Sequence, residues 1–157
     1  MAFAATVAAP GPGEQDDIGG GRLVLLYDPD GQTGWLGPFR VIAYLRAEVE
    51  PEMAADPLLG TVGWSWLTEA LDNHAPGWVA PSGTVTRVIT EGFGGKQDEP
   101  AVTGLELRAS WSPALPPSGV PDLAGHVAAW CDALCTAVGL PPAAAGVSVM
   151  PRRRRRP

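Results

Sequence analysis

A seven-residue segment ending in proline occurs twice, and a Trp-bearing pattern with helical spacing follows each copy. Residues 45–51 are LRAEVEP and residues 107–113 are LRASWSP, with four identities in seven positions. Strand-like alternation leads into both copies, so each half of the chain predicts a strand pair followed by a helix. Either a duplicated ββα unit or a chance likeness between two strands explains this repeated segment. The ββα pattern in each half of the chain depends on neither explanation.

Alternation of apolar and polar residues predicts an antiparallel sheet with one core face and one wetter face. The pattern is clearest at residues 39–49, where every odd position is apolar, and it returns at 105–111. Residues 10–21, rich in Gly and Pro, predict a flexible loop. Strands are expected over residues 1–9, 23–27, 39–49, 84–90 and 105–111.

The first helix is predicted to begin at Asp56-Pro57, with Asp as the N-cap and Pro in the first turn. Its expected core stripe comprises Leu59, Val62, Trp66, Ala70 and His74. Trp64 and Leu71 fall just outside that stripe and widen the apolar surface, so they are the candidate interface with a partner.

The second helix is predicted to end at Gly139, since glycine is a common C-terminal stop. Its expected core stripe is Leu123, Val127, Trp130, Leu134 and Val138.

These patterns predict a single α+β domain over residues 21–142, a length that supports one hydrophobic core. The expected sheet has four to five antiparallel strands in the order (β)ββα–ββα, with two helices on one face. Residues 1–20 are expected to form an N-terminal strand fragment and flexible loop. Residues 143–157 are expected to be a disordered tail that contains an arginine run.

The net charge of −6 conceals an asymmetry along the chain. Five of the 11 basic residues are Arg152 to Arg156, which leaves six against 17 acidic residues, a net charge of −11. A body this acidic repels phosphate backbones, so nucleic acid is a candidate partner only through Arg152–Arg156. A solvated tail is the simpler interpretation of that run.

Charged residues mark one candidate binding face. If the strands at 39–49 and 105–111 are neighbours, Arg46, Glu48, Glu106 and Arg108 form a cross-strand ladder beside Tyr44. One interpretation is a salt-bridged, solvated sheet face. The other is a surface that binds an anion or a partner, with Tyr44 as an apolar contact.

Outside this face, few residues of the chain are of the types that catalyse reactions or bind metals. Cys131 and Cys135 lie four apart on one helix, whereas a zinc site needs three or four converging ligands. His74 and His126 have no nucleophile placed with them, and structural roles are expected for both. We therefore predict no catalytic residue, no metal site and no cofactor.

An ordered series of motifs resembles the actinobacterial family catalogued as domain of unknown function 3000, over about residues 20–142. The motifs are GRLVLLYDPDG (21–31), YLRAE (44–48), DPLL (56–59), WSWLTEAL (64–71), GTVTR (83–87), LELRASW (105–111) and AWCD (129–132). The family has no established activity, so the resemblance transfers no site residue. Its members typically carry a further N-terminal segment, and with that segment helical the order αβββαββα is similar to secretion chaperones, which bind partners and often dimerise.

Three kinds of function follow from these observations. The first is a non-catalytic, cytoplasmic, chaperone-like module that binds an unknown protein or a second copy of itself. The second is an RNA-associated accessory factor that uses the arginine run, and the third is an enzyme of unrecognised chemistry. No membrane association is expected, because no apolar run approaches the ~20 residues of a membrane span.

Overall fold

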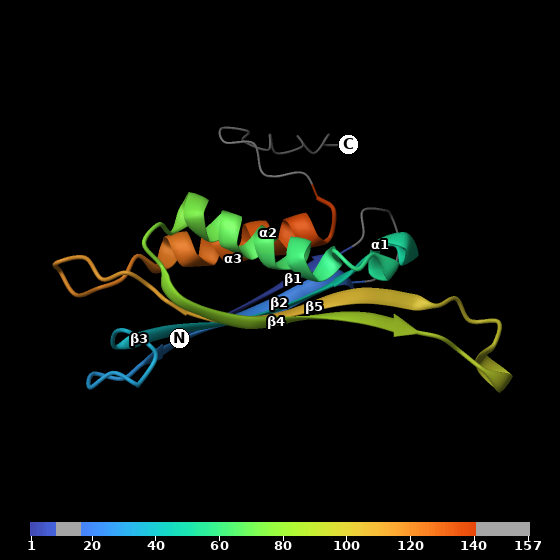
Figure 1. Cartoon of the computed structure of the whole chain (residues 1–157), viewed down its shortest axis with the longest axis horizontal. Coiled ribbons are helices and arrows are strands. Elements are labelled where there is room, and N and C mark those ends of the chain that lie inside the picture. The colour runs from blue at the N-terminus through green and yellow to red at the C-terminus, as the bar shows by residue number, and fades with distance from the viewer. Residues whose placement is uncertain (9–16, 141–157) are drawn as a thin grey trace, which may run out of the picture.

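The alternating segments form five antiparallel strands in a computed structural model that describes residues 1–8 and 17–140. Figure 1 shows them as one sheet in the order β1-β2-β3-β5-β4. The predicted α+β fold is confirmed, with all five expected strands present. Their bounds are β1 Ala2–Ala8, β2 Asp17–Tyr27, β3 Phe39–Glu48, β4 Val79–Thr90 and β5 Val102–Ser112.

The two copies of the repeated seven-residue segment lie side by side at the centre of this sheet. Leu45 of β3 pairs with Leu107 of β5, and Ala43 pairs with Ala109. Leu45 and Leu107, the first residues of the two copies, therefore face one another, and the copies run in opposite directions from this pair. The order β2-β3-β5-β4 has the two-fold arrangement that two ββα units would produce.

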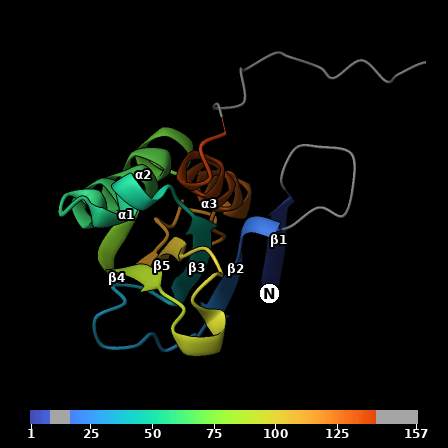
Figure 2. The ribbon, with the colours of Figure 1, turned by 90° about the vertical axis from the view of Figure 1, so that its right-hand side faces the viewer.

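Two long helices, α2 (Leu59–His74) and α3 (Leu123–Ala137), pack side by side on one face of the sheet (Figures 1 and 2). Asp122 caps α3, since its carboxylate accepts from the backbone N–H groups of Ala124 and Gly125. Gly139 has φ +73° just after α3, as expected of a C-terminal stop. A short helix, α1 (Pro51–Ala55), and a 3₁₀ turn, η1 (Gly94–Lys96), complete the elements.

The core lies between the sheet and the two helices. Leu45, Leu107, Trp111 and Trp130 are each at most 2% exposed. Both buried indoles satisfy their N–H groups: Trp111 donates to Nδ1 of His126 at 3.1 Å, and Trp130 donates to the Tyr44 carbonyl at 3.2 Å. These bonds tie α3 to β3 and β5 without leaving a buried donor unpaired.

The expected core stripe of α2 was rotated from the observed one. The residues that face the sheet and α3 are Leu59, Gly63, Leu67, Ala70 and Leu71, whereas Val62 is 40% exposed. The prediction assigned Gly63 no weight because it has no side chain. In the structure, that glycine is what lets α2 approach Leu105 of β5.

The expected boundary between residues 20 and 21 falls inside β2, which begins at Asp17. Glycines predicted a loop there, yet Gly19 and Gly21 are paired within the sheet. A Cβ on Gly21 would meet Trp130, and one on Gly19 would meet Val138. Glycine is required here because α3 lies directly against β2. The tail expected at 143–157 lies outside the described residues.

The helices also begin at residues other than the predicted ones. No helix was predicted before Asp56, but Pro51 begins the short helix α1. The α2 helix begins at Leu59, and Asp56 instead accepts from the Leu58 N–H at 2.8 Å, in the turn before it.

Candidate functional site

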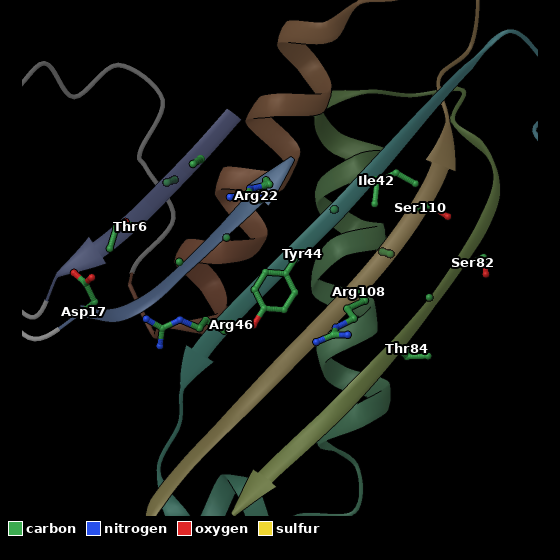
Figure 3. Close-up of a pocket in the computed structure, with 17 residues that line it drawn as sticks. Thr6, Asp17, Arg22, Ile42, Tyr44, Arg46, Ser82, Thr84, Arg108 and Ser110 are labelled. Atoms are coloured by element: carbon green, nitrogen blue, oxygen red, sulfur yellow. The ribbon is translucent and has the colours of Figure 1, made fainter. Parts of the chain in front are cut away.

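The sheet face opposite α2 and α3 is covered by none of the described elements (Figure 1). It is hollowed across all five strands, with a cavity volume of about 870 Å³. Figure 3 looks onto this open face, with the helices behind the sheet. Its labelled lining residues are Thr6, Asp17, Arg22, Ile42, Tyr44, Arg46, Ser82, Thr84, Arg108 and Ser110.

Small side chains form the floor of the hollow. Ala4 of β1 and Gly20 of β2 line it at the edge near Thr6. Gly20 pairs with Arg46 on one side and with Thr6 on the other. Since Gly20 has no side chain, a ligand there reaches the main chain of β2 with Arg46 beside it.

Four of the six basic residues outside the C-terminal run lie on this face. Arg22, Arg46 and Arg108 line the hollow, and Arg40 lies on β3 beyond Ile42. Only three acidic residues, Asp17, Glu48 and Glu106, share the strands of this face. Of the other 14 acidic residues, Glu14 and Asp16 lie outside the described residues, and the remaining 12 lie on helices and connecting segments. Arg87 of β4 pairs with the buried Leu105 and so lies on the helix side of the sheet, and Lys96 lies in η1. The open face is therefore the most cationic part of the described chain.

The strands β3 and β5 are neighbours, as the predicted ladder requires, but of its four charged residues only Arg46 and Glu106 lie directly opposite one another. Tyr44 pairs with Arg108, Arg46 pairs with Glu106, and Glu48 pairs with Gly104. Nη2 of Arg108 lies 3.1 Å from Oε2 of Glu106, and Cζ of Arg108 lies 5.4 Å from the centroid of the Tyr44 ring. Figure 3 shows Tyr44 and Arg108 pointing toward one another. The five side chains of the candidate binding face therefore lie on one surface of the sheet.

Arg22 and Arg46 have no carboxylate within 4 Å among the residues that the structure describes. Arg46 is exposed although Glu106 lies directly across from it, because Glu106 pairs with Arg108 instead. Burial raises the pKa of Tyr44, and the nearby Glu106 carboxylate raises it further, so its hydroxyl stays protonated near neutral pH. The hollow thus offers guanidinium groups and a phenol O–H as donors.

Arg40 supports one end of this face. It is only 7% exposed, and burial lowers the pKa of its guanidinium. Nη1 donates to the Ala80 carbonyl at 2.7 Å, and Nη2 donates to the Ser110 hydroxyl at 2.8 Å. These bonds hold β4 against β5 where their register shifts, between Val79 and Ser82.

The two residues of the candidate interface on α2 lie elsewhere. Leu71 is 1% exposed and belongs to the core, so it is not on the surface of the folded chain. Trp64 is partly buried, and its ring lies over Gly83 of β4. Both packed inward because α2 is rotated from the predicted orientation.

The remaining residues considered for chemistry lie away from the hollow. Cys131 and Cys135 on α3 are unbridged and partly buried, and burial raises the pKa of both thiols. His74 on α2 lies 3.1 Å from Asp132 on α3, which links the two helices. Across residues 1–8 and 17–140, no three His, Cys, Asp or Glu side chains converge as metal ligands.

Arg22, Arg40 and Ser110 were missed as residues of this face. Arg22 was missed because the predicted strand began at residue 23, and the alternation of β2 places it opposite Tyr44. Arg40 and Ser110 were already on the polar side of their predicted strands, and their register could have identified them.

None of the helices among the described residues is long and apolar enough to cross a membrane. Neither the curated proteins nor the solved structures contain a match to this chain. One family model does match, over residues 1–148, and its description is a protein of unknown function, DUF3000. With 148 of 157 residues matched, the chain belongs to the DUF3000 family.

Proposed function

We propose that this protein is a non-catalytic, cytoplasmic binding module that takes an acidic segment of another protein on the open face of its sheet. The observation that carries the proposal is the hollow of about 870 Å³ lined by Arg22, Arg46 and Arg108. Three arginines outnumber the one carboxylate of the lining, Asp17, so the hollow has a net positive charge on a body whose net charge is −11. Charge complementarity of this kind steers and orients a partner.

The lining of the hollow favours binding over chemistry. It contains hydroxyls, guanidinium groups, a phenol, the carboxylate of Asp17 and bare main chain, and neither a His nor a Cys is among its described lining residues. Guanidinium groups bind carboxylates through two parallel hydrogen bonds, which supplies direction as well as attraction. Ile42 is 39% exposed beside them and adds an apolar contact.

A different protein suits this face better than a second copy of the chain. A symmetric contact through two open faces would place the arginines of both copies on the same interface. Like charges at an interface oppose association. Self-association through the open face is therefore not part of the proposal.

Affinity capture from the native host with a matched pair of variants tests this proposal. Arg22→Gln/Arg46→Gln removes two cations from the open face, and Arg87→Gln/Lys96→Gln removes two from elsewhere. We expect the first variant to lose a protein that the wild type and the second variant both retain, after nuclease treatment. Equal capture by both variants would contradict the proposal, and a captured set that vanishes with nuclease would favour RNA.

A further inference from the structure

Glu106 lies between two arginines of the open face. It precedes Arg108 by two positions on β5, so both side chains share one face, and it lies directly across from Arg46 on β3. Its Oε2 is 3.1 Å from Nη2 of Arg108, while Arg46 has no carboxylate partner within 4 Å in the described chain. One carboxylate thus lies beside two guanidinium groups and pairs with only one of them, which leaves these three residues with a net positive charge.

The contact between Glu106 and Arg108 is open to replacement. It uses one nitrogen of Arg108, whose side chain is 67% exposed, and the Glu106 side chain is 32% exposed. An exposed ion pair contributes little to stability, so exchanging one carboxylate for another costs little. The guanidinium of Arg108 also lies 5.4 Å from the centroid of the Tyr44 ring, a cation–π contact that does not involve a carboxylate.

Resting on the proposed function, we propose that Glu106 is an internal competitor for the acidic ligand. In the free protein Glu106 holds Arg108. An incoming carboxylate binds Arg108 in its place, and Glu106 turns across the strand pair toward Arg46, its direct neighbour on β3. The ligand class is therefore a carboxylate-bearing segment, and Glu106 sets its affinity.

Glu48 provides a matched control for this inference. It lies on the same face of β3 as Arg46, it is exposed, and it pairs with Gly104. Replacing either glutamate by glutamine removes one negative charge from the same surface. Only Glu106→Gln also releases Arg108, so the difference between the two variants measures the competition.

The experiment measures binding of a fluorescein-labelled hexaglutamate peptide by fluorescence anisotropy at low salt, where exposed charges are least screened. The full-length chain carries Arg152–Arg156 replaced by glutamine in every variant, so the probe cannot bind that run. We expect Glu106→Gln to bind the peptide about three- to five-fold more tightly than the parent, the scale of one exposed ion pair. Glu48→Gln is expected to change affinity by less than about two-fold.

A double-mutant cycle separates competition from a general effect on the surface. In an Arg108→Gln background Glu106 has no arginine to hold, so Glu106→Gln is expected to tighten binding no more than Glu48→Gln does. Thermal unfolding of each variant checks that the fold is retained.

Equal tightening by Glu106→Gln and Glu48→Gln, or tightening that persists without Arg108, would overturn the inference. Absence of hexaglutamate binding to every variant would overturn it too. Neither result touches the capture experiment with Arg22 and Arg46, so the binding function and the role of Glu106 fail separately.

Discussion

His126 is a buried imidazole whose neighbour defines its protonation state. Nδ1 accepts the indole N–H of Trp111 at 3.1 Å, so Nδ1 carries no proton, and the side chain is 4% exposed. Burial lowers the pKa of His126, while the Asp122 carboxylate opposes that shift more weakly. The neutral ring is therefore the form that fits the fold.

This state predicts a pH dependence of stability. The unfolded chain takes up a proton on His126 near pH 6.5, whereas the folded chain does so only at lower pH. The contribution of neutral His126 is thus complete above about pH 6.5 and falls as the pH drops toward the lower folded pKa. Urea unfolding between pH 7.5 and 5.5 should show stability decreasing more steeply in the wild type than in His126→Gln. His74 is present in both proteins, so parallel pH profiles would refute the assignment to His126.

Arg40 predicts a second effect at the scale of one residue. Its guanidinium bridges the Ala80 carbonyl on β4 to the Ser110 hydroxyl on β5, and Arg40→Met leaves both acceptors without that donor. Charge-assisted bonds of this kind suggest a loss of about 2–4 kcal/mol in the free energy of unfolding. Arg40→Lys keeps the charge but has one nitrogen in place of the fork, so an intermediate loss is expected in chemical denaturation. A loss under about 0.5 kcal/mol for Arg40→Met would show that the bridge is not stabilising.

At the scale of an element, two glycines three residues apart on α2 predict opposite effects. A Cβ on Gly60 meets nothing within 4 Å, so Gly60→Ala should stabilise the protein by about 0.5–1 kcal/mol through helix propensity. A Cβ on Gly63 would lie 2.9 Å from Cδ1 of the buried Leu105, and overpacking costs about 1–3 kcal/mol. Thermal unfolding of both variants measures the difference. If Gly60→Ala and Gly63→Ala stabilised the protein equally, the core face of α2 would lie at Val62 and not at Gly63.

The same elements show what alternation and spacing reveal from sequence. β3 and β5 were predicted with the correct inward face because single-residue alternation leaves only two choices of face. The α2 helix was placed correctly in the chain but rotated, since apolar residues surround it and a glycine, not a side chain, marks the contact with Leu105. Glycine in β2 predicted a loop because its need arises from α3, which is more than 100 residues away in the chain.

The open face was predictable only in part, because some of its features depend on contacts between distant parts of the chain. The ladder on β3 and β5 followed from alternation once the two strands were assumed to be neighbours. The hollow itself depends on Ala4 of β1 and Gly20 of β2, near one edge of the sheet, where small residues leave space beside Arg22 and Arg46. In the sequence alone, small residues do not indicate a binding site. They become recognisable as part of one only when the strand register shows which cationic residues lie beside them.

At the scale of the whole molecule, two cationic regions compete to explain any anionic partner. The open face carries four arginines and the C-terminal run carries five, on a body that is otherwise acidic. Arg152–Arg156 lie outside the described residues, and replacing each region in turn distinguishes the two. Long-range attraction to RNA is expected to follow the run, because the body as a whole repels phosphates.

Replacing Arg152–Arg156 by glutamine therefore predicts a separation of activities. Capture of the protein partner should persist, with affinity lowered by less than about two-fold, because the proposed contacts lie on the sheet. Any RNA retained by the wild type should be lost, and its binding in the wild type should weaken steeply with salt. Capture assays with and without nuclease, at two salt concentrations, measure both effects. Loss of the protein partner with the run would instead place the binding surface at the C-terminus and contradict a function of the open face.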